Sequence, residues 1–312
     1  FQLDEKGNPT NIPHDNGGYC DLAPLDKGEN VRRDICITLE QMGIQPEVSH
    51  HEAGPGQHEV DFKYDEPVRA ADNLSTFKTI VRTVANRNGL HADFSPKPVS
   101  DKPGNGLHIN LSVFKNGKNL FEQDSVADEA KSFLAGILNH IREITAVLNP
   151  SASSYDRLGH FEAPEYIGWS RGNRSQLIRI PFASDGMRSR IELRSPDPSC
   201  NQYAALSLII AAGIEGIEQK AALQPELLIN TFKASEEQLK DLEALPHSLP
   251  EALSLMKASE FVKSVLPDVT VKALVEKGKE LVAAGDKSYI DAVIDPDKMC
   301  SLLFTSGTTG AA

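Results

Sequence analysis

The sequence predicts an α+β fold in which amphipathic helices cover a curved sheet. Three short segments alternate polar and apolar side chains with the period of a strand, and several longer segments repeat apolar residues with the period of a helix. The polar faces of the predicted strands carry Glu, His and Arg side chains. This pattern indicates a sheet whose concave side holds a functional site.

Composition excludes several classes of protein. The chain has 312 residues, of which 40% are hydrophobic, so it can bury one large core or two modest ones. Its formal net charge of −12, without a basic cluster, argues against nucleic acid or an anionic membrane as a partner. No apolar run approaches the ~20 residues of a membrane helix, and no signal peptide opens the chain. Reduced thiols and a cytoplasmic location are expected because the cysteines lack paired spacing: Cys20, Cys36, Cys200 and Cys300.

The first predicted strands surround Gly54-Pro55-Gly56, which indicates a tight reversal. The period of two puts His50 and Glu52 on one face and His51 on the other, with Glu59 following the turn. Glu52 and Glu59 would then lie near the closed end of a hairpin. Neighbouring carboxylates repel unless a cation lies between them, and oxygen ligands suit Mg²⁺ or Mn²⁺. The alternative is a solvated polar turn.

Helices are expected on both sides of this hairpin. Asn30 is predicted to cap a helix from Val31 to about Met42, which Gly43 ends, and a second helix starts at Asp72 or Asn73 and runs to Gly89. Further along, residues 127–148 and 201–220 have clear apolar stripes, and residues 221–274 continue helically with breaks at prolines. Residues 151–172 are polar and irregular, as in a long functional loop.

Two later segments repeat the alternation of a strand. Residues 107–113 place three polar side chains on one face, His108, Asn110 and Ser112. Residues 190–194 do the same with Arg190, Glu192 and Arg194, opposite the apolar Ile191 and Leu193. With the hairpin, they suggest one curved sheet whose polar face binds metal and nucleotide. For Glu192, an ordinary strand salt bridge is the alternative.

Taken in order, five segments of the chain resemble the bacterial glutamine synthetase family, and their combination is highly specific: residues 50–59, 97–98 with 104–108, 161–164, 173–181 and 190–198. The resemblance implies that family's catalytic domain over residues 1–268, an α+β fold with a curved antiparallel sheet flanked by helices. Residues 269–312 are expected to be a foreign tail, because residues 302–310 resemble the Ser/Thr/Gly phosphate loop of acyl-CoA synthetases without the rest of that domain.

The resemblance implies ATP as co-substrate and two Mg²⁺ or Mn²⁺ sites. Glu52 and Glu59 match ligands of the metal near the glutamate, while His108 and Glu192 match ligands of the metal on the ATP phosphates. In the family, each site takes one more carboxylate from a Glu-x-Glu strand, which would precede Phe1. Incomplete sites and weak metal binding are therefore expected.

The resemblance also assigns the remaining site residues. Three are placed at the substrate glutamate: Arg157, Arg194 and Gly104. Three arginines steady the phosphates, and surface charge is their alternative reading: Arg174, Arg179 and Arg190. The nucleoside is contacted by Glu47, Asn110 and Ser112. Glu162 lies on a loop that closes over the site and removes a proton from the bound ammonium, and a mobile solvated carboxylate is its alternative reading.

These assignments imply a ligase that joins ammonia to L-glutamate through γ-glutamyl phosphate. A ligase that takes another amine, and a non-catalytic nucleotide-binding fragment, are the alternatives. The family forms homo-dodecamers through an N-terminal domain and a C-terminal segment, so assembly is expected to be impaired here. Phe232 stands where some bacterial members carry an adenylylated tyrosine, so attachment of AMP is not expected.

Overall fold

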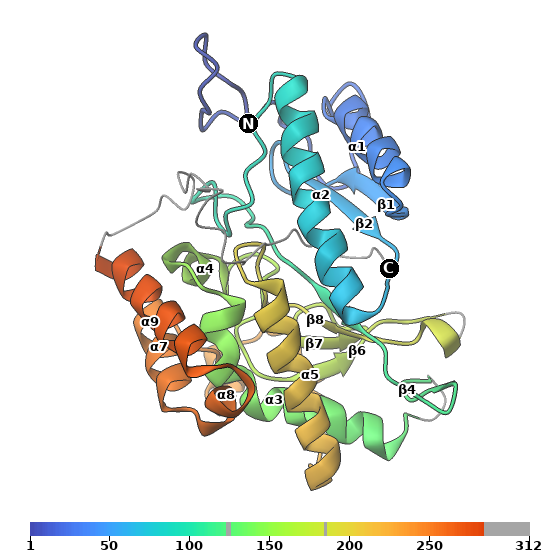
Figure 1. Cartoon of the computed structure of the whole chain (residues 1–312), viewed down its shortest axis with the longest axis vertical. Coiled ribbons are helices and arrows are strands. Elements are labelled where there is room, and N and C mark those ends of the chain that lie inside the picture. The colour runs from blue at the N-terminus through green and yellow to red at the C-terminus, as the bar shows by residue number, and fades with distance from the viewer. Residues whose placement is uncertain (123–125, 184–185, 284–312) are drawn as a thin grey trace. The chain divides into compact units, whose positions relative to one another are not determined.

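The computed structural model describes residues 1–122, 126–183 and 186–283 (Figure 1). The described residues form two compact units. The first unit comprises residues 1–107 and 197–202, and the second comprises residues 108–196 and 203–283. Helices and strands occur in both, which confirms the predicted α+β class. Each unit is described by itself.

In the first unit, two helices pack against a hairpin. The helices are α1 (Glu29–Gln41) and α2 (Pro67–Arg87), and the strands are β1 (Pro46–His51) and β2 (His58–Phe62). They share one apolar core, made of Ile35, Leu39, Ile44, Val60, Phe77, Ile80 and Val84. Burial of these side chains supplies most of the stability of a unit this small.

Both helices begin earlier than predicted. Gly28, not Asn30, is the N-cap residue of α1, so Asn30 lies within the first turn. α2 begins at Pro67 rather than at Asp72 or Asn73. The fixed φ of proline and its missing N–H suit the first helical position, where the N–H would have no partner in any case.

The hairpin predicted around the turn is present. His50 lies opposite Glu59, and His51 lies opposite His58. The turn is closed by hydrogen bonds from Gln57 N to Gly54 O at 3.0 Å and from Glu52 N to Gln57 O at 2.8 Å. Because side chains alternate along a strand, the first pair lies on one face of the hairpin and the second pair on the other.

The second unit contains a sheet of four strands in the order β3 (Ile109–Leu111), β8 (Ile191–Leu193), β7 (Ile178–Ile180), β6 (Trp169–Arg171). β8 is antiparallel to β3 and β7, while β6 and β7 run parallel. Among the described residues, β1 and β2 pair only with each other, so the expectation of one sheet holding all the polar strands is wrong. A period of two specifies the face that a residue occupies, but not the strand beside it.

Helices cover this sheet. α3 (Asp128–Leu148) and α5 (Gln202–Gln219) match their predicted ranges. They cross at glycines, because a Cβ at Gly136 would lie 2.1 Å from Ala212 O and one at Gly216 would lie 2.2 Å from Ser132 O. Three helices follow, α7 (Leu249–Ala258), α8 (Glu260–Val265) and α9 (Asp268–Ala283).

Short elements complete the second unit: the hairpin of β4 (Phe114–Lys115) and β5 (Lys118–Asn119), the 3₁₀ turn η1 (Gly186–Arg188), and α6 (Glu236–Leu239). The segment predicted as a loop at 151–172 contains α4 (Ala152–Arg157), whose first turn is capped by Ser151. The segment predicted as helical from residue 221 has no helix before α6. The Ser/Thr/Gly loop at 302–310 and Cys300 lie outside the described residues. Within those residues, no helix is both long and apolar enough to cross a membrane.

Candidate active site

One face of the hairpin gathers an imidazole and two carboxylates. His50, Glu52 and Glu59 each offer one ligand atom, and these atoms lie within 4.8 Å of one another. His50 Nε2 is 3.5 Å from Glu59 Oε2. Burial lowers the pKa of His50, which Glu52 opposes and Arg32 reinforces, so the ring is neutral with a lone pair available. The sequence predicted the two carboxylates here but missed His50, although the strand period puts it on the same face.

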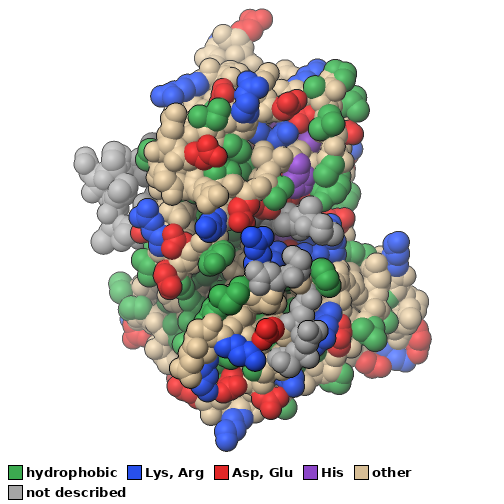
Figure 2. Space-filling view, turned by 90° about the vertical axis from the view of Figure 1, so that its right-hand side faces the viewer, with side chains coloured by type: hydrophobic (Ala, Val, Ile, Leu, Met, Phe, Trp, Pro, Cys, Tyr) green, Lys and Arg blue, Asp and Glu red, His purple; other side chains and the backbone are tan. Residues whose placement is uncertain are grey.

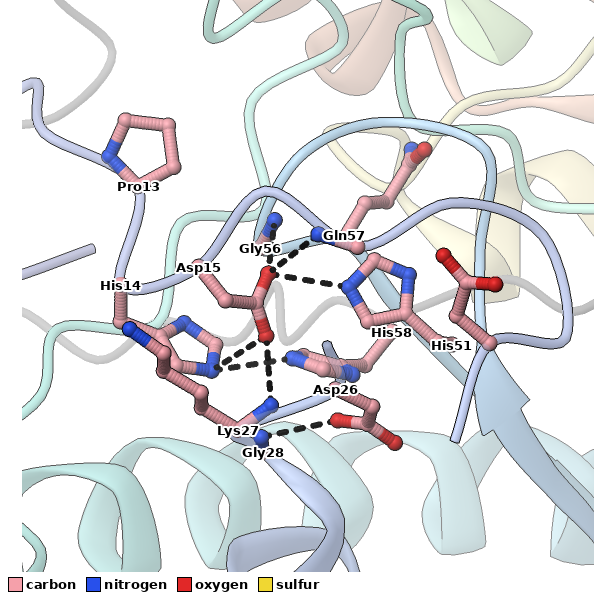
Figure 3. A network of polar contacts seen from close by, with 12 residues as sticks. Pro13, His14, Asp15, Asp26, Lys27, Gly28, His51, Gly56, Gln57 and His58 are labelled. Carbon is pink, nitrogen blue, oxygen red and sulfur yellow. Dashed lines mark hydrogen bonds and ion pairs between the residues drawn. The ribbon is translucent and has the colours of Figure 1, made fainter. Parts of the chain in front are cut away.

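On the opposite face of the hairpin, Asp15 contacts His51. Asp15 lies in the loop before α1 (Figure 3). Its Oδ1 lies 3.0 Å from His51 Nε2 and accepts the Gly56 N–H at 2.8 Å, while its Oδ2 accepts the Lys27 N–H at 3.0 Å. His51 Nδ1 is 2.6 Å from Glu52 O, so both ring nitrogens of this fully buried side chain face oxygen atoms. Burial would raise the pKa of Asp15, but the hydrogen bonds, that from His51 first, hold it well below its usual range.

His58 completes this face. Arg32 NH1 lies 2.8 Å from His58 Nδ1, and Arg32 NH2 donates to Asp26 at 2.7 Å. Since a guanidinium only donates, Nδ1 accepts and the ring proton of neutral His58 resides on Nε2, which is 3.3 Å from His14 Nε2. Burial, reinforced by Arg32, lowers the pKa of His58 to about 3.

By distance alone, this second face could also hold a metal ion, since one ligand atom from each of four residues lies within 4.8 Å of the others: Asp15, Asp26, His51 and His58. The hydrogen bonds of these side chains make the group unsuitable for a metal ion. The Nδ1 lone pair of His58 already accepts a hydrogen bond from Arg32, and the proton on Nε2 leaves that ring without a lone pair for a cation. We therefore assign this face a structural role.

The second unit has its own buried ionic group around Glu192, whose exposed fraction is 1%. Its Oε2 accepts a hydrogen bond from Arg179 Nε at 2.6 Å, and its Oε1 accepts one from Arg194 NH1 at 3.1 Å. His108 Nδ1 lies 3.1 Å from Oε1. Burial would raise the pKa of Glu192, but His108 and the two arginines outweigh it and hold that pKa well below its usual range. Burial and Arg194 lower the pKa of His108 to about 3, so its imidazole is neutral.

Glu162 and Arg174 lie within electrostatic reach of the same group. Burial lowers the pKa of Arg194; the carboxylates Glu192 and Glu162 oppose this effect, while Arg179 and Arg174 add to it. Glu162 is exposed, on the loop between α4 and β6, and its backbone oxygen accepts from Arg194 NH2 at 3.3 Å. The second unit thus brings together six residues that the sequence analysis assigned to the site: His108, Glu162, Arg174, Arg179, Glu192 and Arg194.

Other predicted residues occupy varied positions. Arg190 Nε donates to Asn110 Oδ1 at 2.9 Å, and Ser112 Oγ donates to Ser189 O at 2.9 Å. Arg157 is 2% exposed and donates from NH1 to Ser195 O at 2.7 Å and from NH2 to Arg194 O at 3.1 Å. Its predicted grip on a substrate stays a prediction, because these contacts tie its guanidinium to the strand end after Glu192.

In the first unit, Gly104 O accepts a hydrogen bond from the Gln57 side chain at 3.0 Å, and Glu47 is exposed on β1. On the face drawn in Figure 2, basic and acidic side chains are interspersed among the described residues, in agreement with a chain that carries no basic cluster.

Two groups have side chains that suit a divalent cation: His50 with Glu52 and Glu59 on the hairpin, and His108 with Glu192 in the second unit. Bonds of about 2.1 Å place neighbouring ligands about 3.0 Å apart and opposite ligands about 4.2 Å apart. The 3.1 Å between His108 Nδ1 and Glu192 Oε1 matches the first value, and these two atoms are not aligned for a hydrogen bond. Carboxylates with imidazole are ligands that Mn²⁺ and similar ions accept.

Comparison with known proteins shows the family to which the chain is similar. The family model described as glutamine synthetase, catalytic domain, matches residues 2–285. The glutamine synthetase of Methanosarcina mazei is 48% identical over 273 residues, which is 85% of this chain and 61% of that protein. The glutamine synthetase of Clostridium saccharobutylicum is 44% identical over 275 residues, 86% of this chain and 62% of that protein. The chain thus spans about three fifths of the curated relatives that it matches.

Solved structures give the same result. The structure titled "GmaS/ADP complex" superposes with a TM-score of 0.81 at 32% identity and covers 91% of this chain and 67% of that one. The glutamine synthetase of Plasmodium falciparum superposes with a TM-score of 0.76 at 27% identity, covering 89% of this chain and 63% of that one. The family match passes the predicted boundary at residue 268, and where a foreign tail begins stays a prediction.

Proposed function

The chain belongs to the glutamine synthetase family, and from that premise we propose that it carries the catalytic-domain part of an ATP-dependent ligase joining ammonia to L-glutamate. The buried Glu192 group carries the proposal. It holds a neutral imidazole and two guanidiniums around one carboxylate, an arrangement suited to gathering phosphate oxygens and a divalent cation. A structural salt bridge would not require a third cationic or metal-ligating partner.

The reaction needs a better leaving group than hydroxide, which transfer of the ATP γ-phosphate to the glutamate carboxylate supplies. Glu52 and Glu59 would hold one Mg²⁺ or Mn²⁺, and His108 with Glu192 would hold another. Such ions offset the charge of the phosphate oxygens when bound. The proposal assigns ATP, glutamate and ammonium as substrates.

Arginines orient the negatively charged groups. Glu192 aims Arg179 and Arg194 by hydrogen bonds at 2.6 and 3.1 Å, so both guanidiniums are fixed before a substrate arrives. Arg194 would bind the glutamate with Arg157 and Gly104, while Arg174, Arg179 and Arg190 would steady the phosphates. Asn110, which accepts a hydrogen bond from Arg190, is proposed to contact the nucleoside, as are Ser112 and Glu47.

Glu162 is the proposed base. Its carboxylate lies on an exposed loop yet within electrostatic reach of Arg194, so it can approach a substrate held by that arginine. There it would take a proton from ammonium, which frees the nitrogen lone pair to attack the γ-carbon of γ-glutamyl phosphate and displace phosphate. An acceptor amine other than ammonia would use the same residues.

Further proposals concern the whole protein. We place it in the cytoplasm and expect a homo-oligomer. Residues 1–268 are proposed as the catalytic domain and residues 269–312 as an appended segment. Phe232 offers no hydroxyl, so regulation by attachment of AMP at this position is not proposed.

Formation of γ-glutamyl hydroxamate from glutamate, ATP and hydroxylamine tests the activity. The chain is compared with a version completed to full length with the remaining sequence of the Methanosarcina relative. We expect product from the completed version and loss of about 10²-fold or more in rate with Glu192→Gln. A completed version that folds, binds ADP and makes no product would leave only nucleotide binding, while a faster rate with methylamine than with ammonium would indicate an amine ligase.

A further inference from the structure

We propose that Gln57 is a positioning residue for the substrate glutamate, because its side-chain amide fixes the backbone of Gly104 relative to the hairpin turn. The inference rests on the proposed function, which assigns Gly104 to that substrate. A glycine has no side chain, so Gly104 can contact a substrate only through its backbone. Whatever orients its peptide groups therefore controls that contact. Neither Gln57 nor its partner Asn105 was assigned a role from the sequence.

The Gln57 side chain makes three hydrogen bonds. Its Oε1 accepts the Gly54 N–H at 2.9 Å, while its Nε2 donates to Gly104 O at 3.0 Å and to Asn105 Oδ1 at 2.9 Å. The reversed amide would point its oxygen at two oxygens and its nitrogen at an N–H, so only one orientation satisfies all three partners. Gln57 thus joins its own turn to a residue 47 positions further along the chain.

Asn105 extends this link to the segment before it. Its Nδ2 donates to Ser95 O at 2.8 Å and to Asp93 O at 3.4 Å, while its Oδ1 is the acceptor for Gln57. The orientation of this second amide is therefore fixed as well, since reversal would face donor with donor. The two side-chain amides hold each other and connect three segments of the first unit.

The peptide group between Gly104 and Asn105 is bonded at both ends. Its oxygen accepts from Gln57 Nε2 at 3.0 Å, and its N–H donates to Pro96 O at 2.9 Å. Because a peptide group is planar, two bonds on opposite sides set its orientation. The bond to Pro96 also closes the loop of residues 96–105 at its base, so Gly104 is held at the closed end of that loop.

The hairpin turn is a firm anchor for this link. Gln57 N donates to Gly54 O at 3.0 Å, and Glu52 N donates to Gln57 O at 2.8 Å. In Figure 3 the Gln57 side chain points away from the group around Asp15, so it is available to the loop. Glu52 precedes the turn and Glu59 follows it. Gly104 is thereby held in a fixed relation to both carboxylates, and preorganisation of this kind is what a reaction between several bound groups requires.

Gln57→Glu separates this link from the turn itself. A carboxylate can still accept the Gly54 N–H, but it cannot donate to Gly104 O or to Asn105 Oδ1. Gln57→Met, which adds no charge, is the second variant and serves if Q57E does not fold. Gln45→Glu is the matched control, because Gln45 is an exposed glutamine directly before β1. Thermal unfolding verifies that each variant folds.

Hydrogen exchange of the whole chain without ligands tests the link. Mass spectrometry measures the exchange of peptides that cover Asn105, whose N–H is bonded to Pro96 O. We expect exchange there to become about tenfold faster or more in Q57E and Q57M and to stay unchanged in Q45E, because loss of the link lets the loop base open. Unchanged exchange in both Gln57 variants would overturn the proposal.

Kinetics of γ-glutamyl hydroxamate formation by the completed version test the role in substrate binding. In Q57E and Q57M the KM for glutamate should rise about fivefold or more, as for loss of one net hydrogen bond, while kcat and the KM for ATP change less than about twofold. A purely structural role would lower the active fraction, and so kcat, and leave both KM values alone; that result would overturn the proposal. If the unsubstituted completed version makes no product, the proposed function fails and the substrate role of Gln57 falls with it, whereas the exchange data still decide whether the link exists.

Discussion

The two faces of the β1–β2 hairpin carry similar residues and have opposite hydrogen-bonding states. On one face, His51 and His58 are joined to Asp15, His14 and Arg32. On the other face, His50 lies beside Glu52 and Glu59, and neither of its ring nitrogens is hydrogen-bonded to any residue that the structure describes. Adjacent histidines in one strand thus differ in what they can still bind. Saturation with hydrogen bonds marks a structural role, and an unsatisfied ring beside carboxylates marks a site for a ligand.

Removing the charge of Asp15 should lower the free energy of unfolding more than any other substitution proposed for the hairpin. In Asp15→Asn, the new amide nitrogen would face a backbone N–H from either Lys27 or Gly56, and His51 Nε2 would lose its carboxylate partner. We expect the free energy of unfolding to fall by about 3–5 kcal/mol, measured by urea denaturation. Asp21→Asn in the same loop is the control, since Asp21 accepts one backbone N–H from Gly18, and about 1 kcal/mol is expected there. Equal effects of the two substitutions would contradict a structural role for the Asp15 face.

A methyl group at Gly28 should have the next largest effect. The Cβ of Gly28→Ala would lie 2.4 Å from His58 Nε2, so the ring or the helix start must shift. Overpacking of this kind costs about 1–3 kcal/mol, which thermal unfolding can measure. Gly18→Ala is the matched control, because its nearest neighbour, Asp21 Oδ2, would be at an ordinary contact distance of 3.6 Å. A Gly28→Ala protein as stable as Gly18→Ala would mean that the His58 ring is not held where the structure has it.

Acid should destabilise the packing of the hairpin face that carries His51 and His58. Burial lowers the pKa of His58 to about 3, while the unfolded chain has a value near 6.5. Between these values the unfolded state binds the extra proton, so stability is fully present above about pH 6.5 and is lost as the pH falls toward 3. This residue alone contributes at most about 1.4 kcal/mol per pH unit.

The slope of unfolding free energy against pH, from denaturation between pH 7 and 5, measures this loss. His58→Gln cannot titrate and should flatten the slope by close to one proton. His140→Gln, on the second unit, is expected to leave the His58 contribution in place. An unchanged slope in His58→Gln would show that His58 is charged in the folded protein.

The smallest effect on stability is expected from substitution of His50, on the hairpin face that carries Glu52 and Glu59. His50→Gln removes a partly buried ring that has no hydrogen-bond partner among the described residues, so without metal it should change the free energy of unfolding by less than about 1 kcal/mol. Added Mn²⁺ should then stabilise the unsubstituted chain more than the variant, in a thermal-shift titration. A large loss without metal would place His50 among the structural histidines.

Local patterns explain which features of this hairpin were predictable. The Gly54-Pro55-Gly56 turn and the alternation around it predict the strands and the meeting of Glu52 with Glu59, because these depend on neighbouring residues. Asp15 and Arg32 were not predicted as partners of the histidines. They come from a loop and from α1, and only tertiary packing brings them to β1 and β2.

The second unit repeats this lesson. Glu192 and its arginines were identified through family motifs, while the pairing of β8 with β7 and β3, rather than with the hairpin, could not be read from strand periodicity. Arg157 was assigned to substrate from its motif position, yet its contacts with two backbone oxygens depend on where α4 lies. The short helix α4 itself was missed in a polar, glycine-containing segment.

The hydrogen bond from Gly56 N to Asp15 constrains how this protein family can change. Inserting one residue in the turn between Ala53 and Gln57 would carry the Gly56 N–H away from the carboxylate, although 41 positions separate the two residues in the chain. A longer turn would therefore leave Asp15 with a buried charge and one donor fewer. Turn length and the residue at position 15 are thus expected to be inherited together, so that relatives with a longer turn have also replaced the aspartate.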